Sequence, residues 1–383
     1  MKKLRVLIFS ATFGAGHVRA AEAIIEAIRA KEPGSEISHL DCGEFLNKTL
    51  NKVIKSTYIE LIKHTPKLWG KFYYRTSKIS PHSVFQRFLN RLGRREFLEY
   101  INSVQPDLII CTYPTVAGIL AQLRLKQSLN IPLVTIVTDY AIHSQWIHPG
   151  VDLYVVGCKE VYEGLVSRGI EKQRIQIIGI PVSLKFEVPL DCPSLYEKLG
   201  LDSERLTLLV MGGAYGILEG AKWISKIVAE STAAIQAIIV CGRDQKLYKS
   251  LEHIISEARN PILLLGYVKN VEELMSVADL IITKAGGLTV SEALTKRLPM
   301  IIFKPIPGQE EANAVYVEKI GAGIIAETNE DLERILYRLI DKPQDLKKMR
   351  LAAEKAVIGH SAERAVNLIL KLVDEQKIVQ KIG

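Results

Sequence analysis

A stretch near the start of the chain, LRVLIFSATFGAGH (residues 4–17), sets the pattern for the sequence that follows it. A short apolar run ends at Ser10, a Gly-x-Gly turn follows, and His17 stands where a helix begins. A buried strand, a glycine turn and a helix in this order are typical of the first unit of a parallel α/β sheet. We therefore predict a strand over residues 4–10 and a helix over residues 17–30, whose apolar side chains recur on one face.

The same alternation continues through the first half of the chain and restarts in the second half. Apolar strands separated by helices indicate a parallel sheet that is covered on both faces. We expect an α/β protein of two doubly wound, Rossmann-like domains that face each other across a cleft. The N-terminal domain is predicted over residues 1–185, a linker over 186–205, and the C-terminal domain with the last helices over 206–383. The further buried strands are predicted over residues 107–112, 133–138, 153–158, 175–180, 206–211, 237–241, 262–268, 280–283 and 300–303.

Length and composition limit the class of protein further. A chain of 383 residues is long enough for two domains, because single cores stop growing at roughly 250–300 residues. No apolar run reaches the length of about 18 residues that spans a membrane. The five cysteines lie far apart without a Cys-x-x-Cys pair, which favours a reducing compartment over a disulfide framework or a structural zinc. We expect a cytoplasmic protein.

Positive charge is concentrated in one segment. Residues 48–95 hold twelve Lys and Arg against the single acid Glu60, a charge of +11. The net charge of the chain is +8, so the remainder sums to −3. Aromatic residues alternate with the bases, and the segment over about residues 45–100 is predicted to be a helical insertion. Such a segment suits an anionic membrane surface or single-stranded nucleic acid. A solvated pair of helices with a buried aromatic stripe is the structural alternative.

The glycine turn presents a histidine. The full Gly-x-Gly-x-x-Gly dinucleotide motif is absent, because no third glycine follows Gly14 and Gly16. His17 is predicted at a helix start, and the positive helix end tends to lower the pKa of an imidazole, which keeps it available as a base. The stretch TDYAIHSQWIHPG (138–150) ends a predicted strand at the same edge of the sheet, so Asp139 either orients His17 or is itself the base. The alternative for His17 is a helix-capping residue without chemistry. The histidines near Asp139 do not have zinc spacing.

Three glycine-rich or polar turns follow strands of the second half. In KAGGLTVSEAL (284–294), Gly286 and Gly287 open a helix whose free N–H groups suit a diphosphate, and Glu292 suits the two hydroxyls of a ribose. The turns VMGGAYG (210–216) and VCGRD (240–244) lie at the same rim, and Arg243 is a phosphate candidate. The stretch PIPGQEEANAVYV (305–317) gathers carboxylates and amides that read uncharged sugars, although an acidic first helical turn is the simpler explanation. No Asp-x-Asp metal grip occurs.

The motifs FGAGH, VTDYAIHSQWIHPGVDLYVV, GGLTVSEAL and PGQEEANAVYV, in this order, resemble the monogalactosyldiacylglycerol synthase and processive diacylglycerol glucosyltransferase family. More distantly they are similar to the membrane-associated transferase that adds N-acetylglucosamine in peptidoglycan precursor synthesis. The resemblance implies a GT-B fold, a UDP-sugar donor in the C-terminal domain, a lipid acceptor at the N-terminal domain, inversion at the anomeric carbon, and neither a catalytic metal nor another cofactor. TFGAGH, in place of an unbroken glycine run, is closer to the bacterial members.

The resemblance also assigns candidate site residues. His17 is implied as the catalytic histidine, and Asp139 stays a catalytic candidate from its position after a predicted strand. The implied donor-binding residues are Gly212, Gly213, Arg243, Tyr267, Gly286, Gly287, Leu288, Thr289, Glu292, Gln309, Glu310, Glu311 and Asn313. Candidates for the acceptor and membrane side are Gly14, Gly16, Tyr58, Trp69, Phe72, Tyr73, Arg75, His143 and Trp146.

The sequence therefore predicts an inverting hexosyltransferase that moves glucose or galactose from a UDP-sugar to a diacylglycerol-type lipid, making glycoglycerolipid. We expect it to be peripheral on the inner face of the cell membrane, to contact an anionic membrane surface and not to bind nucleic acid. The alternatives are a UDP-sugar epimerase on the same fold, a UDP-GlcNAc transferase acting on a polyprenyl-linked lipid, and a non-catalytic lipid- or RNA-binding protein. The donor sugar and the number of sugars added stay open.

Overall fold

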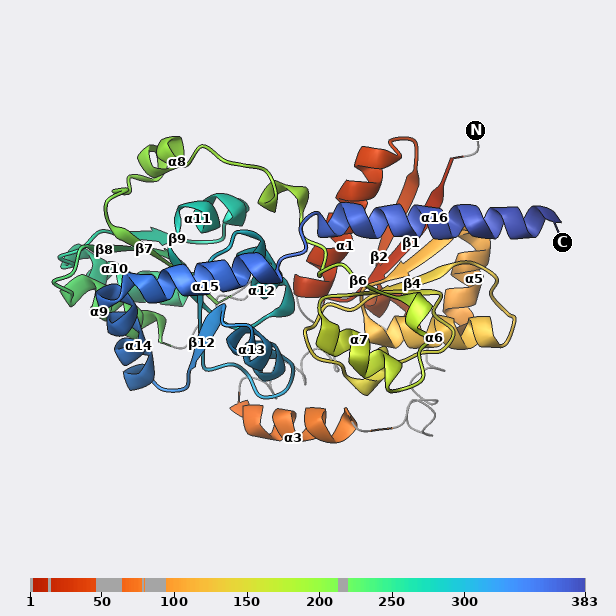
Figure 1. The fold of residues 1–383 in the computed structure, drawn as a ribbon, viewed down its shortest axis with the longest axis horizontal. Coiled ribbons are helices and arrows are strands. Elements are labelled where there is room, and N and C mark those ends of the chain that lie inside the picture. Colours follow the sequence, from red (N-terminus) through yellow and green to blue (C-terminus); the bar gives the residue numbers. More distant parts are fainter. Residues whose placement is uncertain are drawn as a thin grey trace. The chain divides into compact units, whose positions relative to one another are not determined.

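The fold is taken from a computed structural model, which describes residues 3–12, 15–45, 64–77, 79, 94–212 and 220–382. The chain forms two compact units, and Figure 1 shows the helices and strands of both. Unit 1 comprises Met1–Leu184, Pro307–Gln309 and Ile358–Gly383, and unit 2 comprises Lys185–Ile306 and Glu310–Val357.

Unit 1 is built on a six-stranded sheet in the order β2-β1-β3-β4-β5-β6, in which all neighbouring strands run parallel. Residues of β1 lie between two partners, so that Phe9 pairs with Leu40 on one side and with Cys111 on the other. The strands are β1 (Arg5–Ser10), β2 (Glu36–Asp41), β3 (Leu108–Cys111), β4 (Leu133–Ile136), β5 (Leu153–Val156) and β6 (Ile175–Ile177).

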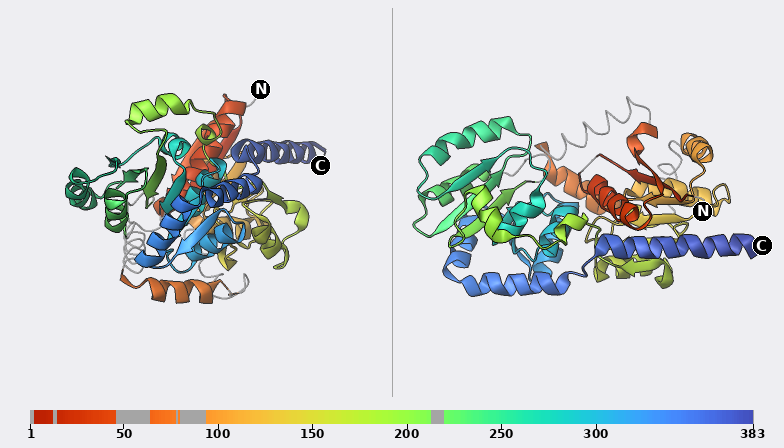
Figure 2. Two further views of the ribbon diagram at one scale, coloured as in Figure 1. Left: turned by 60° about the vertical axis from the view of Figure 1, so that its left-hand side comes forward. Right: turned by 90° about the horizontal axis from the view of Figure 1, so that it is seen from above.

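Helices cover the sheet of unit 1 because successive strand residues point to opposite faces. Val6 and Ile8 pack into one cluster with α1 (Ala15–Lys31) and α16 (Ser361–Ile382), two helices that run beside each other in Figures 1 and 2. Phe9 points to the other face, where its ring lies 5.3 Å from that of Phe97. The other α-helices among the described residues of unit 1 are α3 (Pro66–Thr76), α5 (Arg94–Val104), α6 (Pro114–Leu125) and α7 (Lys159–Val166).

Unit 2 repeats the plan with a parallel sheet in the order β12-β11-β10-β7-β8-β9. Its strands are β7 (Leu206–Met211), β8 (Ile235–Val240), β9 (Ile262–Leu265), β10 (Leu280–Thr283), β11 (Met300–Phe303) and β12 (Gly323–Ala326). Its described α-helices are α8 (Cys192–Leu199), α9 (Ala221–Glu230), α10 (Gln245–Ser256), α11 (Val271–Val277), α12 (Gly287–Thr295), α13 (Gln309–Lys319, whose first residue belongs to unit 1), α14 (Asn329–Asp341) and α15 (Pro343–Ala356).

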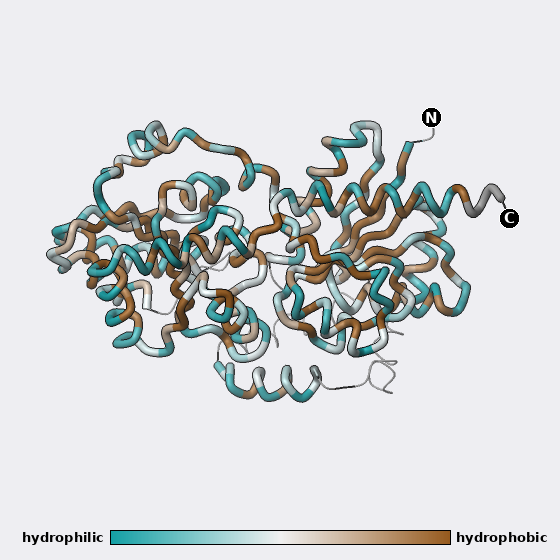
Figure 3. The backbone as a smooth tube through the Cα atoms, viewed as in Figure 1, coloured by the Kyte–Doolittle hydropathy of each residue, from teal (hydrophilic) through white to brown (hydrophobic). Residues whose placement is uncertain are grey.

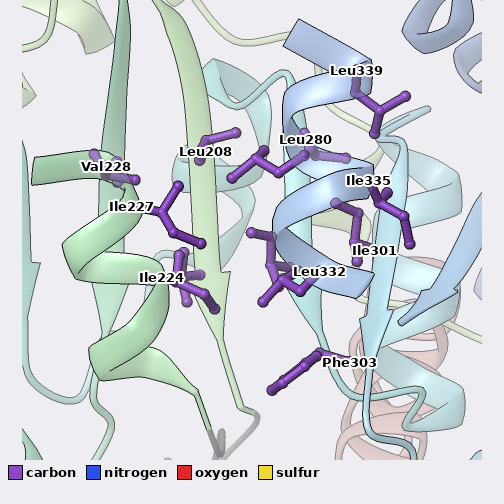
Figure 4. Packing of buried hydrophobic residues seen from close by; sticks show 14 of the residues in the cluster. Leu208, Ile224, Ile227, Val228, Leu280, Ile301, Phe303, Leu332, Ile335 and Leu339 are labelled. Carbon is purple, nitrogen blue, oxygen red and sulfur yellow. The ribbon is translucent and has the colours of Figure 1, made fainter. Parts of the chain in front are cut away.

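The core of unit 2 lies between this sheet and the helices α9 and α14. Figure 4 shows Ile224 of α9 and Leu332 of α14 reaching toward strand residues such as Leu208, and all three side chains are fully buried. Figure 3 shows the same division along the chain, with hydrophobic strands in each unit and hydrophilic turns on the outer helices. Burial of this kind contributes about 25 cal/mol per Å² of apolar surface, so these layers stabilise the sheet edge that carries the candidate site.

The prediction of two doubly wound parallel α/β sheets is confirmed. Two strands were not predicted, β2 and β12, and both lie at an edge of their sheet. The compact units also differ from the predicted domains at three places. The last helix, α16, and the short segment Pro307–Gln309 belong to unit 1, and the predicted linker 186–205 contains α8, which packs on α11 of unit 2. A hydrogen bond from Tyr196 Oη to the carbonyl of Val277 (2.8 Å) holds α8 there.

Candidate active site

His17 lies at the point where the strand order of unit 1 changes direction. The chain passes from β1 to β2 on one side and then crosses to β3 on the other, and α1 begins directly after β1. Open α/β sheets bind ligands at such a switch point, outside the carboxyl ends of the strands. Thr112, at the end of β3, donates a hydrogen bond of 2.9 Å from its hydroxyl to the main-chain carbonyl of His17. The first turn of α1 is thereby fixed to the neighbouring strand.

The ring of His17 is half-buried among three neighbours. Its Nδ1 lies 2.9 Å from Thr138 Oγ1, and the rings of Tyr113 and Trp146 lie 5.2 and 6.3 Å from the imidazole. Burial lowers the pKa of His17 to about 4, although a hydrogen bond involving the main chain of Thr112 acts in the opposite direction. The imidazole is therefore neutral at physiological pH and carries a lone pair.

Asp139 directly follows Thr138 and is 5% exposed. Trp146 Nε1 donates to one of its carboxylate oxygens at 3.4 Å, and Gln309 Nε2 donates to the other. Gln309 belongs to the short segment 307–309 of unit 1, so one of the predicted sugar-reading residues lies against the predicted catalytic carboxylate. Two donors, one on each oxygen, fix the orientation of the carboxylate.

The loop after Asp139 is held in place by hydrogen bonds to the hydroxyl of Tyr154 of β5. The Tyr154 hydroxyl is 2.9 Å from the carbonyl of Trp146, and it accepts a hydrogen bond from the main-chain N–H of His148 at 2.9 Å. His148 is buried, its Nε2 is 2.6 Å from the carbonyl of Gln145, and burial lowers the pKa of His148 to about 4. His148 thus serves the structure of the loop.

The acceptor-side candidates fall into two groups. Tyr73 of α3 lies in contact with His143, with ring centroids 4.7 Å apart, and burial together with the nearby Asp139 carboxylate raises the pKa of Tyr73. Trp146 thus bonds the Asp139 carboxylate, and Tyr73 lies near that carboxylate and in contact with His143. Phe72 and Arg75 are instead exposed on α3, and Trp69 is half-buried. Gly16 lies in the first turn of α1, and Gly14 and Tyr58 lie outside the described residues.

Unit 2 has its own switch point, between β7 and β10. Gly212 follows β7, and Gly286 is the N-cap of α12, which follows β10. The first amide to bond within the helix is Val290 N, which donates to the carbonyl of Gly286 at 3.0 Å. The N–H groups of Gly287, Leu288 and Thr289 precede that bond and point out of the helix end, as an anion site requires. Gly213 lies outside the described residues.

Two further donor-site candidates stand together after β8 and β9. The guanidinium of Arg243 lies 5.1 Å from the ring centroid of Tyr267, a cation–π contact between two exposed side chains. The chain reaches Arg243 through Gly242, whose φ of 59° is readily adopted by glycine. Asp244 then caps α10 by accepting a hydrogen bond from Leu247 N at 2.9 Å. The turn that presents Arg243 is therefore rigidly attached to the helix behind it.

The remaining candidates differ in what their side chains contact. Glu292 and Glu311 are half-buried on α12 and α13. Glu310 accepts a hydrogen bond from Ile306 N at 3.2 Å, and burial raises its pKa while the Lys284 ammonium acts in the opposite direction. Asn313 is fully buried, and its Nδ2 donates to the carbonyl of Ala285 at 3.0 Å. In the structure Asn313 fixes the loop before α12, and its role in reading a sugar stays a prediction.

Sequence reasoning did not single out Thr112, Thr138 or Lys284. Thr112 and Thr138 lie just after the carboxyl ends of β3 and β4, and that position was the available signal. Across the described part of the chain, no group of three or more His, Cys, Asp or Glu side chains is arranged to hold a metal ion. Metal independence stays a prediction. No helix among the described residues has the length and apolar character to cross a membrane.

The fold and the two switch points define a GT-B protein, the class of two-domain glycosyltransferases. The structure resembles MurG of Acinetobacter baumannii, with a TM-score of 0.66 at 17% identity over 97% of this chain and 100% of the other. It also resembles a UDP-GlcNAc 2-epimerase from Neisseria meningitidis bound to UDP-GlcNAc, with a TM-score of 0.61 at 12% identity over 97% of this chain and 100% of the other. At these identities the likeness concerns the fold alone.

Sequence similarity gives the family. A family model described as monogalactosyldiacylglycerol (MGDG) synthase matches residues 17–182, and one described as the glycosyltransferase family 28 C-terminal domain matches residues 207–369. The processive diacylglycerol beta-glucosyltransferase of Bacillus pumilus is 30% identical over 97% of this chain and 95% of its own length. That of Bacillus subtilis is 30% identical over 98% and 97%. The chain belongs to this family of glycosyltransferases.

Proposed function

We propose that the protein transfers a hexose from a UDP-sugar to the hydroxyl of a diacylglycerol-type lipid at a membrane surface, with inversion at the anomeric carbon. The observation that carries this proposal is the meeting of His17, Asp139 and Trp146 at the carboxyl edge of the sheet of unit 1. The names of the relatives, which act on diacylglycerol, support the acceptor, and the anion-ready helix end of α12 supports a nucleotide-linked donor.

Unit 2 supplies the donor site in this proposal. The N–H groups at the start of α12 and the Arg243 guanidinium receive the diphosphate, and the Glu292 carboxylate accepts hydrogen bonds from the ribose hydroxyls. As the bond between the anomeric carbon and the UDP oxygen breaks, negative charge grows on the diphosphate. Fixed N–H dipoles and a cation stabilise that charge more in the transition state than in the bound donor.

Unit 1 supplies the acceptor site. The neutral imidazole of His17 takes the proton of the acceptor hydroxyl, or relays it to Asp139, while the hydroxyl oxygen forms a bond to the anomeric carbon. The oxygen attacks from the face opposite the leaving UDP, so one substitution inverts the configuration. Thr138 holds His17 by its Nδ1, and Trp146 and Gln309 hold the Asp139 carboxylate. Positioned acid–base groups of this kind contribute about 10²–10⁴-fold in rate.

The helix α3 is the proposed membrane contact. Leu68 and Phe72 are 57% and 52% exposed, and Tyr74 is exposed elsewhere on the same helix. Lys67, Lys71 and Arg75 are exposed on the same helix. An exposed helix face that combines large apolar side chains with bases is attracted to an anionic bilayer, where each base contributes about 1 kcal/mol. The inner face of the cell membrane, which is anionic, is the proposed location.

Product analysis tests the function directly. The protein is incubated with radiolabelled UDP-glucose or UDP-galactose and vesicles that contain diacylglycerol, and the lipid products are separated. We expect label in a glycosyl diacylglycerol, with glucose favoured because the relatives are glucosyltransferases by name. Conversion of the sugar nucleotide into its epimer, without any labelled lipid, would contradict the proposal and favour an epimerase.

A further inference from the structure

A buried polar contact joins the last turn of α3 to the loop that follows Asp139. Thr76 is 9% exposed and His143 is 6% exposed, and Thr76 Oγ1 lies 3.1 Å from His143 Nε2. A second bond runs in parallel, because the buried Ser144 hydroxyl donates to the carbonyl of Thr76 at 2.8 Å. We call Thr76, His143 and Ser144 the α3 clamp.

The direction of each bond in the clamp follows from its neighbours. The main-chain N–H of Gln145 donates to His143 Nδ1 at 3.2 Å, so Nδ1 carries no proton. The proton of the neutral ring is then on Nε2, which donates to Thr76 Oγ1. The Thr76 hydroxyl in turn donates to the carbonyl of Phe72 at 2.8 Å. Helix, hydroxyl, imidazole and loop thus form one chain of hydrogen bonds. Removal of the hydroxyl breaks that chain at the side chain of Thr76, and the hydrogen bond between His143 and the main chain of Tyr73 then remains.

The clamp lies on the inward face of α3. Gly70, Tyr73 and Thr76 follow one another at helical spacing and form the face toward the rest of unit 1. At Gly70 a Cβ atom would lie only 2.5 Å from Pro307 Cβ, so the helix approaches the 307–309 segment closely. Leu68 and Phe72 lie on the opposite, exposed face.

The loop end of the clamp leads directly to the candidate base. Ser144 begins the short helix η2 (Ser144–Trp146), and Trp146 Nε1 donates to Asp139. Tyr73 links the clamp to Asp139: its ring contacts that of His143, and the negative charge of Asp139 acts on its hydroxyl. A displacement of α3 from this loop therefore changes the surroundings of Asp139.

We propose that the α3 clamp positions the lipid acceptor, by holding the membrane-contacting helix at a fixed place relative to Asp139 and His17. This inference rests on the proposed function, since it takes α3 as the helix that contacts the membrane. Thr76 and His143 are positioning residues in this account: they act through the placement of α3 and do not touch the reacting atoms.

The test compares Thr76→Val, which keeps the shape but removes the hydroxyl, with Thr76→Ser, which keeps the hydroxyl. Three quantities are measured for each variant: apparent KM for diacylglycerol in vesicles, Kd for the UDP-sugar, and vesicle flotation. We expect Thr76→Val to raise the apparent KM by about tenfold. Kd and flotation should stay at wild-type values, because neither the donor site nor the exposed face of α3 is altered. Thr76→Ser, which keeps the hydroxyl, should have the wild-type KM.

The remaining outcomes are assigned in advance. A wild-type KM for Thr76→Val, or an equally raised KM for Thr76→Ser, overturns the clamp as a positioning device. Loss of flotation by Thr76→Val also overturns it, because the clamp would then serve membrane binding itself. Ser144→Ala removes the second bond and is measured in parallel, so that it decides the matter if Thr76→Val does not fold. A wild-type protein that neither floats nor labels lipid refutes the proposed function, which is a different result.

Discussion

Three histidines of unit 1 share a lowered pKa, and their contacts separate them by role. Burial lowers the pKa of His17, His143 and His148 to about 4 in each case. The ring nitrogens of His143 bond to Thr76 of α3 and to the main chain of the loop, and His148 Nε2 bonds to the main chain of the same loop. His17 instead sits at the switch point, beside Thr138 and the two aromatic rings. Only part of this follows from sequence, which places His17 and Asp139 at one edge but does not foresee Thr138 or the Gln309 contact.

The role of His17 predicts a pH–rate profile. A base acts when it is deprotonated, so a pKa of about 4 leaves kcat/KM flat from pH 5.5 to 8. His17→Ala should lower kcat by about 10²–10⁴-fold without changing the Kd for the UDP-sugar, and Asp139→Asn should show whether the carboxylate shares the proton. An acidic limb centred near 6.5, the ordinary pKa of histidine, or normal transfer by a folded His17→Ala protein, would rule out this role.

Stability should fall as the pH is lowered through the range in which only the unfolded chain binds protons. The folded-state pKa of His148, about 4, lies below the unfolded value of about 6.5. Its contribution is therefore fully present above pH 6.5 and is lost as the pH falls toward 4, with a cost of about 2 kcal/mol at pH 5. Urea unfolding of His148→Gln should show a shallower pH dependence between 4 and 6.5. An unchanged slope would mean that His148 does not titrate in this way.

Two neighbouring residues of unit 2 make a matched pair. Arg243 is exposed, so Arg243→Ala should raise the Kd for UDP about tenfold and leave the unfolding free energy unchanged. Asp244 caps α10, so Asp244→Ala should cost about 1 kcal/mol of stability with little effect on UDP binding. Isothermal titration and urea unfolding measure the two effects. If both variants lower the free energy of unfolding and neither changes the Kd for UDP, Arg243 is not part of a nucleotide site.

At the scale of elements, the central strands were predictable and the edges were not. Strands such as β7 and β10 are continuous apolar runs because both of their faces are covered. The edge strand β2 reads EISHLD, in which only Ile37 and Leu40 are apolar, and β12 is four residues long and begins with Gly323. The place of α16 was also not predictable, because the apolar pattern of a helix does not indicate which of two sheets it packs against. Its contacts with α1 are set by tertiary packing.

The exposed face of α3 carries a prediction at this scale. Leu68→Ser together with Phe72→Ser should strongly reduce flotation with anionic vesicles, because it removes the apolar part of the contact. Added salt should weaken the binding of the wild type, since Lys67 and Lys71 act through charge. The matched control is Leu125→Ser, on α6, whose side chain is 61% exposed but lies outside α3. Equal loss in the control, or release of the protein by RNA, would contradict a membrane role for α3.

For the whole molecule, two parallel sheets with different strand orders provide two sites of different chemistry. Each unit has a parallel sheet with a switch point at its carboxyl edge. In unit 1 that edge holds a neutral imidazole near a buried carboxylate, and in unit 2 it holds a glycine-capped helix end and a guanidinium. Proton transfer suits the first set of groups and a diphosphate suits the second. The division of labour between the units is the central claim of this account.

A crystal structure of the protein with UDP tests that claim most directly. We predict the diphosphate at the N–H groups of Gly287–Thr289, near Arg243, with the ribose at Glu292, and the His17 region free of nucleotide. Nucleotide bound at the first turn of α1, beside His17 and away from Glu292, would contradict the account.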